Sequence, residues 1–431
     1  MRFVFTPPAE SAAGLLSRPW SEPLESWQDE RLVEVARRGL HRHVVRFVTE
    51  GGQVFALKEL DERLARKEYN LLRRLEDLAI PAVEVLGVVV DRPGGMDSVL
   101  VTKFLDYSTS YRTLFANPRG VRLADRLLDA QVELLARLHL AGFMWGDCSL
   151  SNTLFRLDAG ALEAYLVDAE TAELHDRLSD GQRSYDVGMA RERVGGELFD
   201  LQAGDLLPAD IDPVEIADQL ERRYEALWAE LTSEEILKPE EQRYRIAERV
   251  RRLNELGFDV DEVELVDVGE GSKLRLRTRV AEPGHYRRLL FTRTGIDAQE
   301  NQARRMLADI ASFRGWMEQT SKRPVPESVA ANRWLSEVYE PVMAAIPPEL
   351  RGRLDEPEIF HEVLEHRWFL SERAGRDIGT TAAVRDYVTR VLPSVPDGLL
   401  IRTPAPVSGR HARAPEPEDD WEVEQAEPPA G

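Results

Sequence analysis

At residues 145–152 the chain reads Trp145-Gly146-Asp147-Cys148-Ser149-Leu150-Ser151-Asn152. An apolar run over residues 127–140 leads into this stretch and predicts a helix, and residues 152–157 predict a strand that leads out of it. A second short apolar run, residues 165–167, ends at Asp168. The pattern predicts a polar loop with a carboxylate at Asp147 and an amide at Asn152, followed by a hairpin that ends on a second carboxylate.

This order of polar groups suits phosphoryl transfer to a hydroxyl. In such chemistry one carboxylate orients and deprotonates the acceptor, while an amide oxygen and a second carboxylate hold Mg²⁺ on the nucleotide phosphates. The alternative is a plain polar turn in which Asn152 and Asp168 are ordinary turn residues, because the spacing Asp-x-x-x-x-Asn also arises by chance. The surrounding sequence decides between the two.

The stretch resembles the catalytic loop of the protein-kinase-like fold. It is closest to the RIO-type kinases, the aminoglycoside phosphotransferases and the bacterial lipopolysaccharide (Kdo) kinases. Those families have His-Gly-Asp or His-Arg-Asp where this chain has Trp145-Gly146-Asp147. The resemblance implies a two-lobed fold, ATP and Mg²⁺ as cofactors, Asp147 as the catalytic base, and Asn152 and Asp168 as metal ligands.

The composition predicts an ordinary globular protein of two or three domains, since 43% of its 431 residues are hydrophobic and 31% charged. Its formal net charge of −21 argues against nucleic acid or an anionic membrane surface as a main partner. Cys148 is the single cysteine, which excludes an internal disulfide and favours a cytoplasmic location. We expect neither a signal peptide nor a membrane span.

Upstream, residues 44–48 and 53–58 predict a β-hairpin that ends at Lys58 in Phe-Ala-Leu-Lys. This resembles the Val-Ala-Ile-Lys of kinases, whose lysine contacts the nucleotide phosphates. Residues 62–78 predict a helix, and Glu68 lies on its apolar face, where a carboxylate is costly unless it is paired. We therefore expect an ion pair between Lys58 and Glu68. The alternative is that Lys58 lies at the surface of an edge strand and Glu68 at the edge of the apolar face of the helix.

Two nucleotide contacts follow from the resemblance alone. The segment 38–43 lies where kinases have a glycine-rich loop, but it has a single glycine, Gly39, which would approach the phosphates. Residues 102–105 would form the hinge whose backbone pairs with adenine, with Thr102 and Phe104 as the binding positions. A buried strand that leads into an ordinary linker is an equal alternative for the hinge.

After Asp168 the chain departs from the kinase pattern, because Ala169 and Glu170 stand where kinases have Phe-Gly. Glu170 is either an additional metal carboxylate or a solvated loop acid. Asp186 resembles the buried aspartate that braces the catalytic loop of kinases. No Ala-Pro-Glu element lies between Asp168 and Asp186, which favours a small-molecule, glycan or lipid hydroxyl, or an unusual protein, as the acceptor.

The remaining sequence contains no recognisable catalytic motif. A charged amphipathic helix is predicted at 240–256, and strands are predicted at 263–266, 273–279 and 286–292. Four helices follow, and we expect Trp316, Trp334, Leu364 and Trp368 to be core residues. His361 and His366 lie five residues apart, which does not fit the spacing of a helical zinc pair, so we expect core or surface histidines.

The expected fold is α+β, with a β-rich small lobe and a helical second lobe, followed by a mainly helical domain with a small antiparallel sheet. We place the kinase-like domain at 1–235, with its lobes at about 1–105 and 106–235. A helical domain of unknown function follows at 236–400, and a disordered acidic tail at 401–431.

The expected function is ATP-dependent phosphoryl transfer to a hydroxyl, in which Glu68 positions Lys58 and Lys58 binds the phosphates. The alternative is a pseudokinase, a nucleotide-binding regulatory or scaffold protein that works through its C-terminal domain, which could also bind a protein partner. A purely helical interaction protein is a third alternative, in which the ordered polar residues are coincidence.

Overall fold

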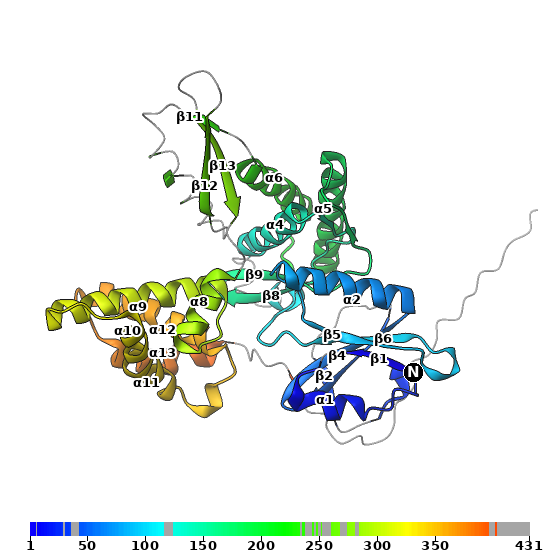
Figure 1. Cartoon of the computed structure of the whole chain (residues 1–431), viewed down its shortest axis with the longest axis horizontal. Coiled ribbons are helices and arrows are strands. Elements are labelled where there is room, and N and C mark those ends of the chain that lie inside the picture. The colour runs from blue at the N-terminus through cyan, green and yellow to red at the C-terminus, as the bar shows by residue number, and fades with distance from the viewer. Residues whose placement is uncertain are drawn as a thin grey trace, which may run out of the picture.

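The computed structural model describes residues 1–5, 7–28, 31–35, 43–115, 124–232 and 284–395, with short pieces at 235–237, 244, 247–248, 251, 260–267, 274–280 and 401–402. Figure 1 shows an N-terminal sheet with α2 on one face, a group of helices beside it, and a separate C-terminal group of helices. This arrangement agrees with the expected two-lobed α+β fold and the mainly helical part that follows it.

The small lobe is built on one antiparallel sheet with the strand order β1-β5-β6-β4-β3-β2-β14. The expected hairpin is present, and its register pairs Val44 with Glu59. The last strand, Ile401–Arg402, pairs with β2, so the expected tail at 401–431 begins with two strand residues at the open edge of the sheet. Residues 403–431 lie outside the described residues. The strands are β1 (Arg2–Phe5), β2 (Leu32–Val35), β3 (Val44–Glu50), β4 (Gln53–Leu60), β5 (Val85–Val90), β6 (Ser98–Lys103) and β14 (Ile401–Arg402).

The two faces of this sheet are covered by different elements. Helix α1 (Ala9–Leu16) lies on one face, where Trp20 and Trp27 are buried in a core with sheet residues such as Phe55. Helix α2 (Glu62–Asp77) covers the other face, and its leucines join the main core of the two lobes. Asp61 caps α2 by accepting the N–H of Arg63 at 2.8 Å, which fixes where the helix begins.

The second lobe is mainly helical, and its three long helices lie side by side in Figure 1. Two short antiparallel pairs, β7 with β10 and β8 with β9, lie where these helices meet the small lobe. A Ser179–Gln182 capping box begins the longest helix. The elements are α3 (Tyr111–Phe115), α4 (Ala124–Leu140), β7 (Phe143–Met144), β8 (Thr153–Asp158), β9 (Ala161–Leu166), β10 (Glu173–Leu174), α5 (Asp180–Ala203) and α6 (Pro213–Thr232).

The C-terminal part has its own core around Trp334, Phe360 and Tyr387. A five-residue π-helical turn at Leu335–Tyr339 joins two of its helices. The small expected sheet has the strand order β11-β13-β12. The elements are β11 (Glu235–Leu237), β12 (Val260–Asp267), β13 (Leu274–Val280), α8 (His285–Thr294), α9 (Glu300–Ser321), α10 (Glu327–Trp334), α11 (Glu340–Ala344), α12 (Glu356–Ala374) and α13 (Thr380–Arg390).

Two expectations for this region are wrong. The strand expected at 286–292 is helix α8, because Glu300 accepts the N–H groups of Tyr286 and Arg287 and so satisfies the first turn of a helix. The side chains of Trp316 and Trp368 are exposed rather than buried, since each lies on the outer face of its helix. The helix expected at 240–256 lies mostly outside the described residues.

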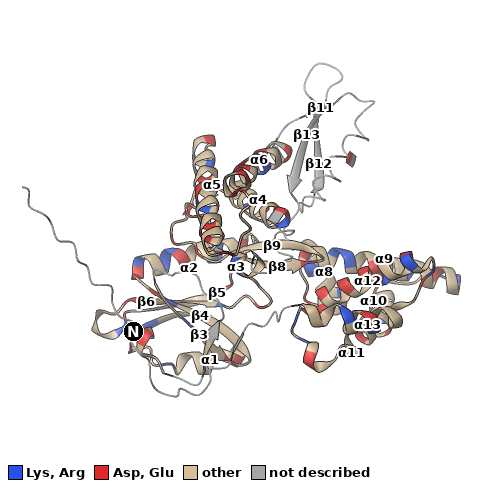
Figure 2. Ribbon diagram, turned by 180° about the vertical axis from the view of Figure 1, so that it is seen from behind, with Lys and Arg blue, Asp and Glu red and all other residues tan. Residues whose placement is uncertain are grey.

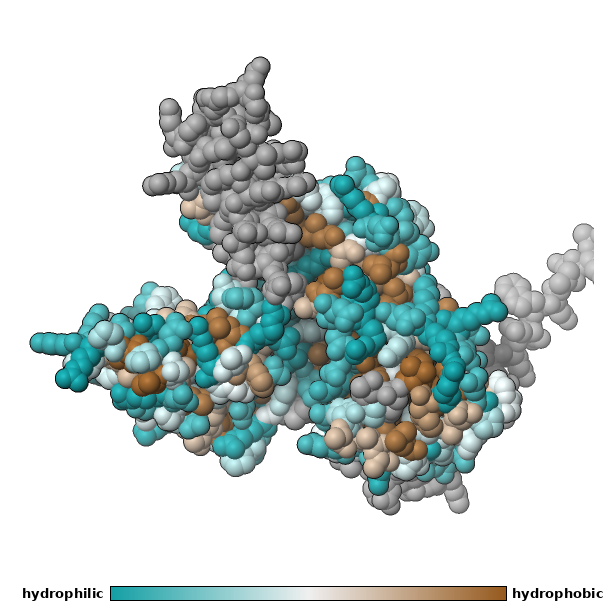
Figure 3. Space-filling model, in the orientation of Figure 1, coloured by the Kyte–Doolittle hydropathy of each residue, from teal (hydrophilic) through white to brown (hydrophobic). Residues whose placement is uncertain are grey.

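The described surface mixes both signs of charge. Figure 2 shows acidic and basic residues interspersed along α5, α6, α9 and α12. On the face shown in Figure 3, hydrophobic residues form small groups between hydrophilic areas. Within the described ranges, every helix is too short or too polar to cross a membrane.

Candidate active site

The catalytic-loop candidate lies between α4 and β8, and two glycines give it its path. Gly142, with φ +78°, ends α4, and a Cβ there would collide with the carbonyl of His175. Gly146 has φ +76°, a left-handed conformation that L side chains rarely adopt. These glycines turn the chain sharply before Asp147 and so bring its partly exposed carboxylate out between α4 and β8.

Asp186 braces the loop from below, as the resemblance implies. Its buried carboxylate accepts the backbone N–H groups of Trp145 and Gly146, both at 2.7 Å. The ring of His139 lies 3.0 Å from the same carboxylate through Nε2, and its Nδ1 lies 2.6 Å from the hydroxyl of Tyr224. The loop backbone is thus tied to α4, α5 and α6 at once.

A second carboxylate, Glu197 on α5, holds the far side of the loop. It accepts the N–H groups of Leu150 at 2.7 Å and Ser151 at 3.0 Å. Glu197 belongs to no loop motif and was not predicted. The one signal in the sequence is its distance of eleven residues from Asp186, which is three turns along one face of a helix.

The loop carries Asp147 and Asn152 into direct contact. The amide nitrogen of Asn152 donates to Oδ2 of Asp147 at 3.1 Å, so the amide oxygen is the atom that Asn152 would offer to a cation. On its other side Asp147 is paired with Arg193 of α5, whose Nε lies 3.1 Å from Oδ1. Arg193, which lies one helical turn before Glu197, was not predicted from the sequence.

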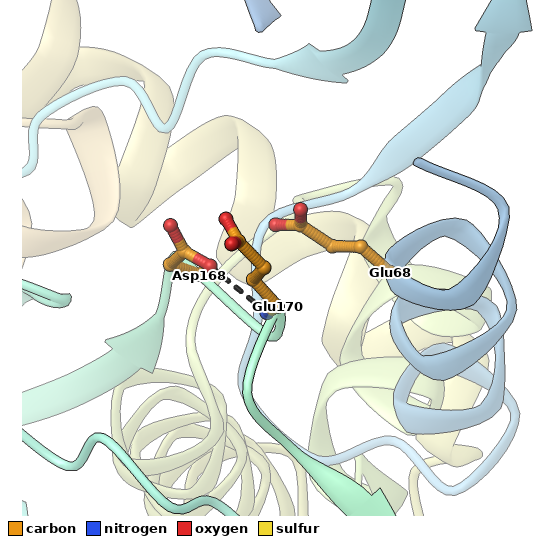
Figure 4. Close-up of side chains that lie close together, drawn as sticks. All are labelled: Glu68, Asp168 and Glu170. Carbon is orange, nitrogen blue, oxygen red and sulfur yellow. Dashed lines mark hydrogen bonds between the residues drawn. The ribbon is translucent and has the colours of Figure 1, made fainter. Parts of the chain in front are cut away.

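Lys58 on β4 is the centre of the second half of the site. Its Nζ lies 3.1 Å from Glu68 on α2 and 2.7 Å from Asp168, which follows β9. The third carboxylate is Glu170, 3.3 Å away. The expected contact between Lys58 and Glu68 is therefore present, and Figure 4 shows the three carboxylates pointing toward one another from α2 and the loop after β9.

Burial sets the charges of this group. Burial raises the pKa of Glu68 to about 7, and nearby Asp168 adds to this while Lys58 opposes it. Burial alone would lower the pKa of Lys58, but the charges of Glu68 and Asp168 outweigh it and hold the pKa above its usual value. Lys58 is therefore a cation at neutral pH.

The donor set suits a hard divalent cation. Oxygen atoms of Glu68, Asp168 and Glu170 lie within 4.8 Å of one another. Asn152 lies in the loop beside this segment, where its backbone carbonyl accepts the N–H of Val167 at 3.0 Å. Carboxylate and amide oxygens are the ligands that Mg²⁺ takes in nucleotide sites.

Glu170 has more partners than a solvated loop acid. Its Oε2 lies 2.8 Å from Nε2 of His43, and its carbonyl accepts the ammonium of Lys67 at 3.0 Å. Its N–H donates to Oδ1 of Asp168 at 2.9 Å, the bond drawn in Figure 4. These contacts fix Glu170 at the edge of the carboxylate group.

Trp145, which replaces the histidine of the related families, is fully buried. Its indole Nε1 donates to the carbonyl of Asp168 at 2.9 Å, and its own carbonyl accepts the hydroxyl of Thr171. Trp145 therefore joins the catalytic loop to the segment after Asp168.

Of the three residues expected from the resemblance alone to contact the nucleotide, the structure describes Thr102 and Phe104. Gly39 lies outside the described residues. Thr102 is in β6, paired with Ala56 and Val85, and Phe104 donates its N–H to the carbonyl of Val54 at 2.8 Å. The amide of Phe104 is thus engaged within the small lobe.

Two other features lie away from this site. His361 is buried against Arg305 and Glu365, and His366 pairs with Asp386, so the two rings have different partners. A cavity of about 700 Å³ lies where the second lobe meets the C-terminal helices, with Arg137, Glu163 and Arg305 among its lining residues.

The fold and the polar group are those expected of a kinase-like phosphotransferase, and comparison with known families agrees with this. Residues 29–191 match the model of the lipopolysaccharide kinase (Kdo/WaaP) family, which confirms the resemblance read from the sequence. This part of the chain is lipopolysaccharide-kinase-like, and the match supports a kinase-type enzyme. Residues 226–392 match a domain of unknown function (DUF4032), which fits the uncharacterised C-terminal part.

The comparisons with individual proteins are more distant. No curated protein matches this chain. Among the solved structures that match is "WaaP in complex with acyl carrier protein", at 20% sequence identity and a TM-score of 0.34. The match covers 53% of this chain and 100% of that one.

Proposed function

We propose that this protein transfers the γ-phosphoryl group of ATP to a hydroxyl acceptor, with Asp147 as the catalytic base and Mg²⁺ held by Asn152 and Asp168. The observation that carries the proposal is the convergence of Lys58, Glu68 and Asp168, which come from a strand, a helix and a loop far apart in sequence. Kinases use such a lysine–glutamate pair beside a metal-binding aspartate to hold the phosphates.

Each residue has a role that its position supports. Asp147 lies on a loop braced by Asp186 and Glu197, so its carboxylate would orient the acceptor hydroxyl and take its proton. Lys58, fixed by Glu68, would bind phosphate oxygens. Bound Mg²⁺ would neutralise the phosphates, and Glu170 lies close enough to Asp168 to contribute to that site.

The segment after Asp168 bears on the acceptor. No Ala-Pro-Glu element lies between Asp168 and Asp186, so the feature with which protein kinases dock peptides is missing from the sequence. We therefore favour a small-molecule, glycan or lipid hydroxyl over a peptide. A cytoplasmic location belongs to the same proposal.

A specific observation also favours a second candidate, a nucleotide-binding pseudokinase. Arg193 pairs with Asp147, which engages the carboxylate that would act as base. In an active enzyme Arg193 would have to move toward the phosphates or the acceptor when they bind. In a pseudokinase the pair would persist.

The deciding experiment is transfer from labelled ATP to fractionated cell extract, with wild type compared with Asp147→Asn. We expect Asp147→Asn to lower transfer by about 10²–10⁴-fold while ATP affinity stays unchanged. Asp176→Asn, an exposed aspartate of the same lobe, is the matched control and keeps full transfer. Full transfer by Asp147→Asn would refute the assignment, and Mg²⁺-dependent ATP binding without transfer to any fraction would favour the pseudokinase.

A further inference from the structure

The two proposed metal ligands flank the open end of one hairpin, one beside each strand. Asn152 directly precedes β8, and Asp168 follows β9 by one residue, Val167. At this base Thr153 pairs with Leu166, and the N–H of Val167 donates to the carbonyl of Asn152 at 3.0 Å. The hairpin strands are paired along their whole length, which makes the hairpin a stiff element about 20 Å long.

The opposite end of this hairpin is inserted into the C-terminal helices. Figure 1 shows β8 and β9 reaching from the second lobe to α8 and α9. The two-residue turn, Ala159–Gly160, has positive φ at both positions, 53° and 77°. Alanine rarely adopts this conformation, so the surroundings must hold it there.

A single carboxyl group holds that turn. Glu358, in the first turn of α12, accepts the N–H of Ala159 at 2.7 Å and the N–H of Gly160 at 2.9 Å. Glu358 is fully buried, so water cannot replace it as a partner. Gln302 donates to the same carboxyl at 2.7 Å and so fixes its orientation.

A reciprocal contact runs the other way. Asp158, the last residue of β8, accepts the N–H groups of Asn301 at 3.0 Å and Gln302 at 2.8 Å. Both N–H groups are in the first turn of α9, where they have no hydrogen-bond partner within the helix. Each part therefore contributes a buried carboxyl that binds backbone N–H groups of the other. Leu157 beside them packs against both cores.

We propose that the C-terminal helical part positions the metal-binding end of the kinase-like lobe by clamping the tip of the β8–β9 hairpin, with Glu358 and Asp158 as its positioning residues. This inference rests on the proposed function, because it assigns the metal ligands to Asn152 and Asp168. Glu358 and Asp158 lie at the tip of the hairpin and not at its base. Their effect passes through the hairpin, whose tip they hold and whose base carries the ligands.

The test compares two variants of α12 in the full chain. Glu358→Gln keeps the shape but sets an amide NH₂ against at least one of the backbone N–H groups of the turn. Glu362→Gln makes the same change one turn later, where the side chain binds the hydroxyl of Tyr387 entirely within the C-terminal part. ATP binding is measured by calorimetry with Mg²⁺ and with EDTA, and the melting temperature of each variant is recorded.

We expect Glu358→Gln to weaken Mg²⁺-dependent ATP binding by about 10-fold, which lies within the usual range of coupling between two distant sites, with binding in EDTA unchanged. Glu362→Gln lowers the melting temperature without changing either affinity. Equal affinities for both variants and the wild type, or equal losses in both variants, would overturn the inference. If the wild type shows no Mg²⁺-dependent ATP binding, the proposed function fails first and the inference fails with it.

A second pair of variants applies if Glu358→Gln does not fold. Asp158→Ala removes the contact with α9, and Asp309→Ala removes the partner of the Trp334 indole within the C-terminal core. We expect Mg²⁺-dependent ATP binding to weaken in Asp158→Ala and to stay unchanged in Asp309→Ala. Unchanged affinity in Asp158→Ala would overturn the inference.

Discussion

Arg193 Nε and Asp147 Oδ1 lie 3.1 Å apart, so the proposed catalytic base is held from both sides, by Arg193 of α5 and by Asn152 of its own loop. Both side chains of the ion pair are partly exposed, so bound ligands can reach them. An arginine beside the base can orient it, and can turn toward phosphate oxygens when the phosphates arrive.

We expect Arg193→Ala to lower phosphoryl transfer by about 10²-fold, the usual effect of misplacing a catalytic group by about 1 Å. ATP affinity should change little. Arg191→Ala is the control, since Arg191 lies on the same helix but pairs with Asp218. Steady-state transfer assays with both variants measure the difference, and equal rates would show that Arg193 is only a surface residue.

The lysine–glutamate pair gives a prediction about stability. Lys58→Met leaves Glu68, Asp168 and Glu170 without their ammonium, and breaking a buried pair typically costs about 3–5 kcal/mol. Adding Glu68→Gln removes one stranded charge, so a double-mutant cycle should show coupling of about 0.5–3 kcal/mol. Denaturant unfolding measures it, and the exposed Arg73–Glu76 pair on α2 should show almost none. Zero coupling between Lys58 and Glu68 would contradict the structure.

Asp158 gives a pH prediction. Burial and the charge of Glu163 raise its pKa to about 8, while the N–H groups of Asn301 and Gln302 oppose this. Because the folded pKa lies above the usual value, the folded protein keeps a proton that the unfolded chain loses. The resulting stability is complete below the usual pKa of an aspartate and is lost as pH rises through about 8.

The wild type should therefore lose more thermal stability than Asp158→Asn between about pH 4 and pH 8, since asparagine mimics the protonated acid. Melting curves over this range provide the measurement. Asp309→Asn, within the C-terminal core, should follow the wild-type slope. Identical slopes for the wild type and Asp158→Asn would show that Asp158 is ionised in the fold throughout.

The sequence located the first half of this site well. Lys58, Glu68 and Asp168 could be brought together from the sequence because the elements that carry them follow the order found in kinases, as the resemblance implies. Glu68 was the clearest case, since a carboxylate on an apolar stripe needs a partner. The structure supplies that partner at 3.1 Å.

The sequence located the second half poorly, for identifiable reasons. Arg193 and Glu197 belong to no loop motif, and they reach the site only because α5 passes beneath it. Residues 286–292 looked like a strand because apolar residues dominate, but Glu300, beyond the segment, caps it as a helix. The contact of Glu358 with the turn at Ala159–Gly160 could not be predicted, since the sequence of a hairpin turn does not indicate which distant carboxyl group will bind it.

The last prediction concerns Glu170, which the sequence left open between metal ligand and solvated acid. The structure places Glu170 within 3.3 Å of Lys58 and beside Asp168, with His43 at 2.8 Å. If Glu170 contributes an oxygen to the cation, its charge matters only when the metal is present. If it merely pairs with Lys58, removing its charge would free the lysine for the phosphates.

The two roles predict opposite results for Glu170→Gln. We expect Mg²⁺-dependent ATP binding to weaken by about 10-fold, and binding in EDTA to stay constant or improve as Lys58 is released. Asp168→Asn should lose Mg²⁺-dependence altogether, because it supplies the central carboxylate of the group. Glu173→Gln, an exposed residue beside His175, is the control and should match the wild type. Stronger binding of Mg²⁺-ATP by Glu170→Gln would exclude Glu170 from the metal site and leave it as the partner that holds Lys58 before nucleotide binds.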